Sequence, residues 1–268
     1  MDFFFDLEKL LQETNVEKKL ADFHSFYEVF LKDNNICFDE LSTPKVFDKP
    51  SFHERCNIVH PTKVPNRKNL HTKEGLGTLL HAIAHIEYSA IDLALDACYR
   101  FRGLPRKFYE DWMEVADDEV RHFNMICKVM EQYDIKYADI PVHQGLFDAS
   151  MKSLEFIPRM ALIPRYMEAN GLDANQILID KLKNVPNTQK VIELLNIILE
   201  EEIEHVKKGD YWYKYGCDKK ENFSCDYFTI VNKLYPNSFK GNKNLNYEAR
   251  KKAGFSDEEL QKLQSFIK

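Results

Sequence analysis

The chain has 268 residues and a mass of 31.6 kDa, enough to bury a sizeable hydrophobic core. Its net charge of −6 gives no general electrostatic reason to bind nucleic acid or an anionic membrane, although a local basic patch is compatible with that charge. The first residues lack the basic start and apolar run of a signal peptide, and no stretch approaches the roughly 18 apolar residues of a spanning helix. We therefore expect a cytoplasmic protein with no membrane partner, whose six cysteines are free thiols; an exported protein with disulfides is the alternative.

The N-terminal quarter is predicted to be two short helices followed by an extended arm. Apolar residues recur at helical spacing through residues 5–33, with charges between them. Four prolines then occur between residues 34 and 72, which excludes a long helix there. We expect this segment to pack on the rest of the protein, because compact domains rarely contain long loose loops; a linker between independent domains is the alternative.

The first strong helical pattern extends from Glu74 to about Arg102 and has Glu87 at the centre of its apolar face. Successive helical residues are rotated by about 100°, which places seven apolar residues within about 60° of Glu87. His81 and His85 fall on the opposite side, so their i, i+4 spacing does not direct them to the same centre. We expect these histidines on a polar outer face or against the N-terminal arm, with a second metal site as the alternative.

Two later helices carry the same Glu-x-x-His motif on their apolar faces. The helix predicted over about 108–133 contains Glu119 and His122, and the last helix of the central region contains Glu202 and His205. In both motifs the acid occupies a position where a leucine would be expected.

A third helical region is predicted between these two, over about 146–170, and is expected to end at Gly171. Two prolines within it make its angular register unreliable. We favour Glu168 as its inward-facing acid, with Glu155 as the rival acid earlier in the region. The main alternative is a buried ion pair of Glu168 with Arg159 or Arg165.

The order along the chain is therefore Glu, Glu-x-x-His, Glu, Glu-x-x-His, the pattern by which a ferritin-like four-helix bundle holds two metal ions. A buried ionised carboxylate costs several kcal/mol, and converging carboxylates also repel one another. Two divalent cations remove both costs, and this donor set suits iron, or manganese, better than a structural zinc. A single Glu-x-x-His is usually a surface ion pair or an interhelical hydrogen bond, so the hypothesis depends on both copies. The predicted metal ligands are Glu87, Glu119, His122, Glu168, Glu202 and His205.

The predicted fold is all-α, with the ferritin-like four-helix bundle over residues 73–216. Residues 1–72 form the N-terminal helices and arm, and residues 217–268 form a C-terminal helical extension. That extension is expected to hold two covering helices, over 223–235 and 256–267, the second beginning with a capping box of Ser256 and Glu259.

The stretch from about Leu70 to Cys217 resembles a bacterial ferritin-like family called domain of unknown function 455. The matching segments are LHAIAHIE at 80–87, FYEDW at 108–112, EVRHF at 119–123, PVH at 141–143, PRYMEANGLD at 164–173 and EIEHV at 202–206. The resemblance implies a ferritin-like fold and carries over the same six residues as metal ligands. It implies no reaction, because the activity of the family is itself unassigned.

The expected function is that of a dinuclear, diiron carboxylate oxidoreductase of the hydroxylase or oxidase type, which activates oxygen on an unidentified small-molecule substrate. The alternatives are iron handling or peroxide removal, or a non-catalytic interaction module that metal stabilises. A redox role would need a separate electron donor, because the chain has no CxxC pair. Four cations cluster at one helix junction and leave transfer RNA as an open alternative partner, although the acidic balance argues against nucleic acid: Arg100, Arg102, Arg106 and Lys107.

Overall fold

The computed structural model describes residues 1–33, 35–39, 41–220, 225–240 and 244–266, and their regular elements are all helical. Apart from helices, the described residues contain the isolated bridges of Asp2 with Cys37 and of Ile58 with Val142. The predicted all-α class is thus confirmed. The chain divides into two compact units, Met1–Asp148 and Ala149–Lys268. The predicted bundle spans both units and remains a prediction.

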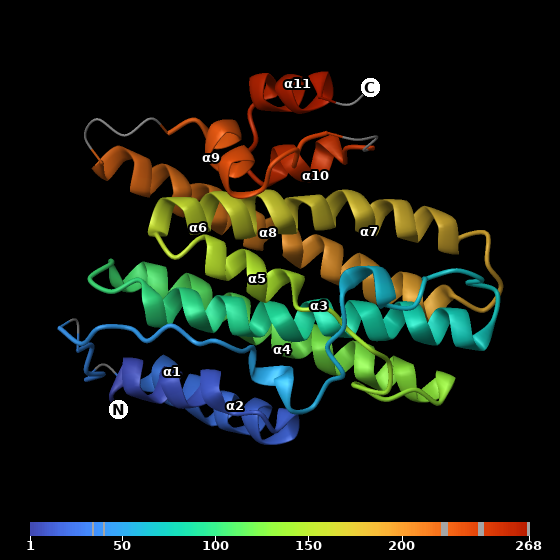
Figure 1. The fold of residues 1–268 in the computed structure, drawn as a ribbon, viewed down its shortest axis with the longest axis horizontal. Coiled ribbons are helices and arrows are strands. Elements are labelled where there is room, and N and C mark those ends of the chain that lie inside the picture. Colours follow the sequence, from blue (N-terminus) through green and yellow to red (C-terminus); the bar gives the residue numbers. More distant parts are fainter. Residues whose placement is uncertain (34, 40, 221–224, 241–243, 267–268) are drawn as a thin grey trace. The chain divides into compact units, whose positions relative to one another are not determined.

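The first unit is built around a pair of long helices (Figure 1). Its elements are α1 (Phe3–Gln12), α2 (Val16–Lys32), η1 (Ser51–His53), η2 (Pro61–Lys63), α3 (Lys73–Arg100), α4 (Arg106–Met130), η3 (Glu131–Tyr133) and the start of α5 (Gly145–Lys152). Gly103, at φ 69°, makes the turn from α3 into α4, a conformation that glycine adopts without steric cost. The two predicted N-terminal helices are confirmed as α1 and α2.

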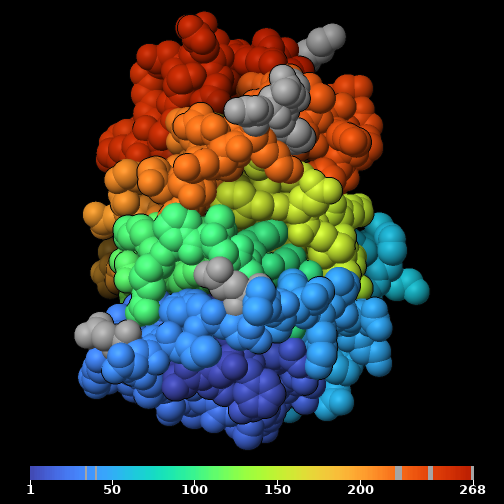
Figure 2. All heavy atoms as spheres, turned by 90° about the vertical axis from the view of Figure 1, so that its left-hand side faces the viewer, coloured from blue at the N-terminus to red at the C-terminus, as the bar shows by residue number. Residues whose placement is uncertain are grey.

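The N-terminal helices and the arm cover the face of α3 that the sequence suggested was polar and outward. The buried ammonium of Lys19, on α2, pairs with Asp92 of α3, and the Ser51 hydroxyl donates to the same carboxylate at 2.7 Å. Tyr88 and Asp96 on that face are 0% and 8% exposed. In the space-filling view of Figure 2, the N-terminal helices and the lighter blue segment after them form one continuous surface. The expectation that the arm packs on the helices is therefore met within this unit, and that of a polar outer face is wrong.

The second unit is built around the long helix α8, which packs against α6, η4 and α7. Its elements are α6 (Phe156–Leu162), η4 (Ile163–Glu168), α7 (Ala169–Leu182), α8 (Gln189–Lys219), α9 (Tyr227–Leu234), α10 (Tyr247–Lys252) and α11 (Asp257–Ser265). The capping box of Ser256 and Glu259 is present at the start of α11. The C-terminal extension has three helices in place of the two expected, and residues 223 and 267 of those predicted helices lie outside the described part of the chain.

Pro164 changes the type of helix between α6 and α7 without ending it. Proline has no N–H to donate to the preceding turn, and the chain widens there into the π-helix η4. The helix then continues past Gly171 to Leu182, so the predicted end at Gly171 is wrong. A glycine inside a helix costs only about 1 kcal/mol, and the burial of Leu172 and Ile179 outweighs it.

The end of α8 is linked covalently to the segment that follows it. Cys217 and Cys225 form a disulfide, with their Cα atoms 5.8 Å apart. The expectation that all six cysteines are free thiols is therefore wrong for this pair, while Cys37, Cys56, Cys98 and Cys127 are free. Cysteine usage consequently no longer supports the cytoplasmic expectation. Within the described residues, none of the helices has the length and apolar character needed to cross a membrane.

Candidate metal centre

Three of the six predicted ligands meet in the first unit. Glu87 extends from α3, and Glu119 and His122 extend from one face of α4. His122 Nδ1 lies 3.2 Å from Glu87 Oε2 and 3.6 Å from Glu119 Oε2. One ligand atom from each of the three residues lies within 4.8 Å of the others. All three side chains are buried, at 5%, 1% and 0% exposure.

The charges in this trio favour a cation. Burial alone would lower the pKa of His122, but the nearby carboxylate of Glu119 and the hydrogen-bonded carboxylate of Glu87 raise it to about 11. His122 is therefore an imidazolium at neutral pH in the metal-free protein, held between two carboxylates. A divalent ion would take over this role by displacing the proton, because imidazole binds metals only in its neutral form.

The glutamate and the histidine of the second Glu-x-x-His motif lie together in the second unit. Glu202 and His205 occupy successive turns of α8, with His205 Nδ1 3.6 Å from Glu202 Oε1. The imidazole is fully buried, and the Glu202 side chain is 14% exposed. This pair has the spacing and the facing side chains that the motif predicts.

Glu168, the sixth predicted ligand, is the last residue of η4. Two contacts between the η4–α7 segment and α8 show which residues of α8 lie beside it. A Cβ atom on Gly209 would lie 2.3 Å from Cβ of Pro164, so the backbone of α8 passes very close to η4. Further along, the Asn175 amide donates to the Leu195 carbonyl at 3.2 Å. These two contacts define an antiparallel register. Interpolation between them puts Glu168 level with residues 202–205 of α8.

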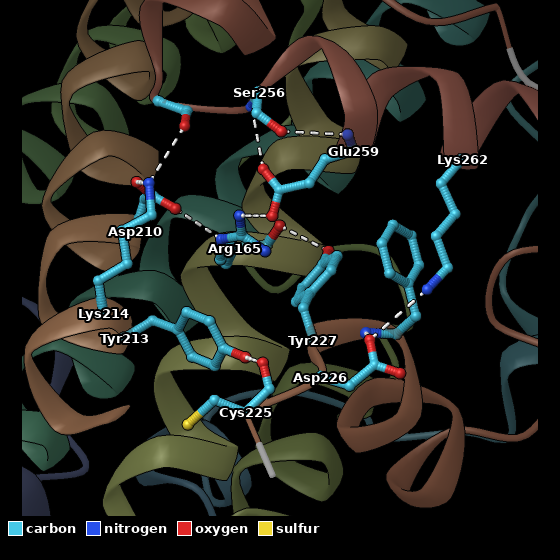
Figure 3. A network of polar contacts seen from close by, with 12 residues as sticks. Arg165, Asp210, Tyr213, Lys214, Cys225, Asp226, Tyr227, Ser256, Glu259 and Lys262 are labelled. Atoms are coloured by element: carbon cyan, nitrogen blue, oxygen red, sulfur yellow. Dashed lines mark hydrogen bonds and ion pairs between the residues drawn. The ribbon is translucent and has the colours of Figure 1, made fainter. Parts of the chain in front are cut away.

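Arg165 was the main competing partner for Glu168, and it binds other acids (Figure 3). Its Nε donates to Asp210 Oδ1 at 2.7 Å, and its Nη2 donates to Glu259 Oε1 at 2.5 Å. The guanidinium lies 4.2 Å from the ring centroid of Tyr227, whose hydroxyl donates to the Arg165 carbonyl. Arg165 thus joins η4, α8 and α11, and the predicted alternative of a Glu168–Arg165 pair is wrong. Arg159, the other named partner, donates to the carbonyls of Ser150 and Ser153.

His81 and His85 hold the segment after α4 against α3. The His85 Nε2–H donates to the His143 carbonyl at 2.8 Å, and its Nδ1 accepts from the Tyr137 hydroxyl at 3.1 Å. His81 Nε2 accepts the backbone N–H of Ala138 at 3.0 Å. The His85 ring also packs edge-on against Phe52 of the arm, at 4.7 Å between centroids. Both histidines are buried, which rules out the polar outer face and agrees with the expected arm contact.

The four cations near the α3–α4 turn are engaged within the protein. Arg100 and Lys107 each bind an aspartate one turn away on their own helix, at 2.6 Å. Arg102 donates to the Asp39 carbonyl, and Arg106 pairs with Glu110 at 3.3 Å. These contacts reduce the charge that the cluster presents to a phosphate.

Comparison with known proteins agrees with the resemblance found in the sequence. A family described as "Protein of unknown function (DUF455)" matches residues 12–261. The chain belongs to this family. An "Uncharacterized protein" from Haemophilus influenzae resembles this DUF455 chain with 34% identity over 285 residues, covering 99% of this chain and 97% of its own. No solved structure matches the chain. The DUF455 match extends beyond the central helices into the arm and the C-terminal extension.

The sequence did not predict two features of this DUF455 protein. The disulfide joins cysteines eight residues apart that belong to no recognisable motif. The Arg165 network unites residues 165, 210 and 259, which no local pattern connects. The one sequence signal for this network was the position of Arg165 among apolar residues. An arginine that is buried there needs acidic partners for its charge.

Proposed function

We propose that this protein holds two metal ions, iron or manganese, between the trio Glu87, Glu119 and His122 and a second group formed by Glu168, Glu202 and His205. In this proposal α3, α4, the α6–η4–α7 segment and α8 form one ferritin-like four-helix bundle. The observation that carries the proposal is the clustering of buried ligand atoms in the first group. The carboxylates of Glu87 and Glu119 and the imidazole of His122 are 5%, 1% and 0% exposed, and each offers a ligand atom within 4.8 Å of the others.

The chemistry of the donors supports iron or manganese. Six donors, four carboxylates and two imidazoles, provide oxygen ligands that can bridge two ions and nitrogen ligands that suit iron. The four free cysteines are not among these donors, which argues against a structural zinc or an iron–sulfur site. The equal heights of Glu168 and the pair on α8 make them suitable as one ligand group.

The reaction that fits this centre best is oxidation of an organic substrate by an oxygen-activating oxidoreductase. Bound ferrous ions would supply electrons to dioxygen, and a separate donor would restore them. The apolar shell from Ile83, Trp112 and Phe123, which are 9%, 2% and 3% exposed, would limit solvent access to the reacting oxygen.

An anaerobic titration tests the proposal. The full chain is loaded with ferrous iron, metal per chain is counted, and dioxygen or peroxide is then added while the optical spectrum is followed. We expect two irons per chain and a transient oxygen-dependent absorption. Glu119→Ala and Glu202→Ala should each reduce the count, whereas Glu110→Gln on the exposed face of α4 should not.

Other results would select the alternatives. Uptake of many irons would favour storage, and rapid consumption of peroxide without reaction with dioxygen would favour detoxification. Two tightly held ions that react with neither oxidant would indicate a metal-stabilised interaction module. Unchanged metal binding in both alanine variants would contradict the proposed centre itself.

A further inference from the structure

A pocket of about 340 Å³ lies in the first unit, on the side of α3 that carries His81 and His85. Its walls come from α3, from the arm at residues 61–67 and from the segment 140–146. Its volume falls within the range of small-molecule sites. Among the described residues that line it, none is a proposed metal ligand, so the pocket is a separate site.

The polar side of the pocket is positively charged. Arg67 is the one lining residue with a permanent charge, and the described lining contains no acid. His143 Nδ1 accepts the Gly145 N–H at 3.1 Å, so the neutral ring carries its proton on Nε2. Burial lowers the pKa of His143, the positive charge of Arg67 lowers it further, and the negative charge of Asp148, which is not among the lining residues, raises it. The side chains of Arg67 and His143 belong to residues that line the same pocket.

A buried donor adds to this character. His81 is 1% exposed and lines the pocket, and its Nε2 accepts the backbone N–H groups of Ala138 and Ile140. Its proton is therefore on Nδ1, and within the described part of the chain no protein acceptor is found for that atom. This N–H adds a donor to those of Arg67 and His143 in the lining, which suits an anionic ligand.

Part of the remaining lining is apolar and conformationally restricted. Pro61, Pro65 and Pro141 form part of it, together with Ile86, whose side chain is 43% exposed. Proline has a fixed φ angle and no N–H, so these walls offer apolar contact at little entropic cost. An inorganic anion would leave this surface uncovered, whereas an organic body would bury it.

We propose that this pocket binds a small organic carboxylate with an apolar body. The carboxylate is bound by the guanidinium of Arg67 and the Nε2–H of His143, and the body packs on the prolines and Ile86. The site does not depend on the metal centre, so the two proposals stand or fall separately.

The test uses the full chain without added metal and four probes: benzoate, hexanoate, benzamide and inorganic phosphate. Binding is followed by calorimetry and by NMR of the His143 ring. We expect both carboxylates to bind, and benzamide and phosphate to bind at least about tenfold more weakly. Arg67→Gln should weaken carboxylate binding by a similar factor. Lys63→Gln, which removes an exposed cation of the same arm outside the lining, should leave it unchanged.

A second variant tests the location. Ala82 lines the pocket from α3, and Ala82→Phe should fill the space and abolish binding while the thermal transition of the protein is retained. Equal binding of benzoate and benzamide would overturn the role of charge, and equal binding of phosphate would overturn the apolar contact. Absence of carboxylate binding at millimolar concentration, or equal effects of the Arg67 and Lys63 variants, would overturn the site.

Discussion

Glu119→Gln tests whether the buried trio is a metal site, because the substitution removes a charge and preserves the shape of the side chain. In the metal-free protein His122 loses one of its two nearby anions, but Glu87, 3.2 Å away, remains as the partner of its proton. The imidazolium and the remaining carboxylate still form a pair, so we expect a stability loss of only about 1–3 kcal/mol, the usual effect of an imperfectly paired buried group. The larger effect should appear only when metal is present.

The size of that effect follows from ligand linkage. A metal at a hundred times its dissociation constant stabilises the native protein by about 2.7 kcal/mol. For a chain of this length each kcal/mol raises Tm by about 2–4 °C, so the wild-type protein should gain about 5–11 °C. If loss of one carboxylate weakens binding about a hundredfold, the gain at the same metal concentration falls to about 0.4 kcal/mol, or about 1–2 °C.

The assay is calorimetric unfolding under anaerobic conditions, with ferrous iron, manganese or a chelator. Each variant is compared with itself, so that its metal-dependent shift is separated from any change in its metal-free stability. Glu110→Gln is the matched control, since Glu110 lies on the exposed face of the same helix and forms a surface pair with Arg106 at 3.3 Å. A wild-type protein that gains nothing from either ion, or a Glu119→Gln variant with the full gain, would refute the reasoning.

Two further predictions concern polar groups outside the trio. Burial lowers the pKa of His81 to about 4, below the unfolded value of about 6.5, so the unfolded chain takes up the proton first and stability falls on acidification through this window. His81→Gln should remove an acid-induced loss on the order of 1–3 kcal/mol in urea unfolding at pH 7 and 4.5, and exposed His71→Gln should not. Arg165→Met should cost about 1–3 kcal/mol in the same assay, because Asp210 and Glu259 lose their shared buried partner while Lys214 and the Ser256 N–H still bind them; a loss no larger than that of Lys262→Gln would contradict this.

The helices that carry the trio could be predicted because their signal is local. Apolar spacing identified α3 and α4, and a tight turn between them makes their apolar faces meet. Once α3 and α4 are antiparallel neighbours, Glu87 and His122 fall at the same height, which the 3.2 Å contact bears out. The pairing of Glu202 with His205 could be predicted from the periodicity of a single helix alone.

The remaining features depend on contacts that no local pattern encodes. Polarity placed His81, His85 and Asp92 on one face of α3, but polarity does not say whether that face meets water or another segment. Lys19 and Ser51 cover this face. Their shared partner, Asp92, is 73 residues from Lys19 and 41 residues from Ser51 in the chain. The close approach of Pro164 to Gly209 is likewise a contact that sequence spacing within η4 cannot reveal.

The covered face of α3 bears on the metal centre because polar contacts fix a helix in a way that apolar contacts do not. An apolar face tolerates small rotations and shifts, whereas a hydrogen bond is lost when its donor moves by a fraction of its length. His81, His85 and Asp92 bind partners outside α3 at three successive levels of the helix, and Glu87 lies between the second and third. His81, His85 and Asp92 thereby set the height and rotation of Glu87, a proposed metal ligand, through contacts that do not involve its carboxylate.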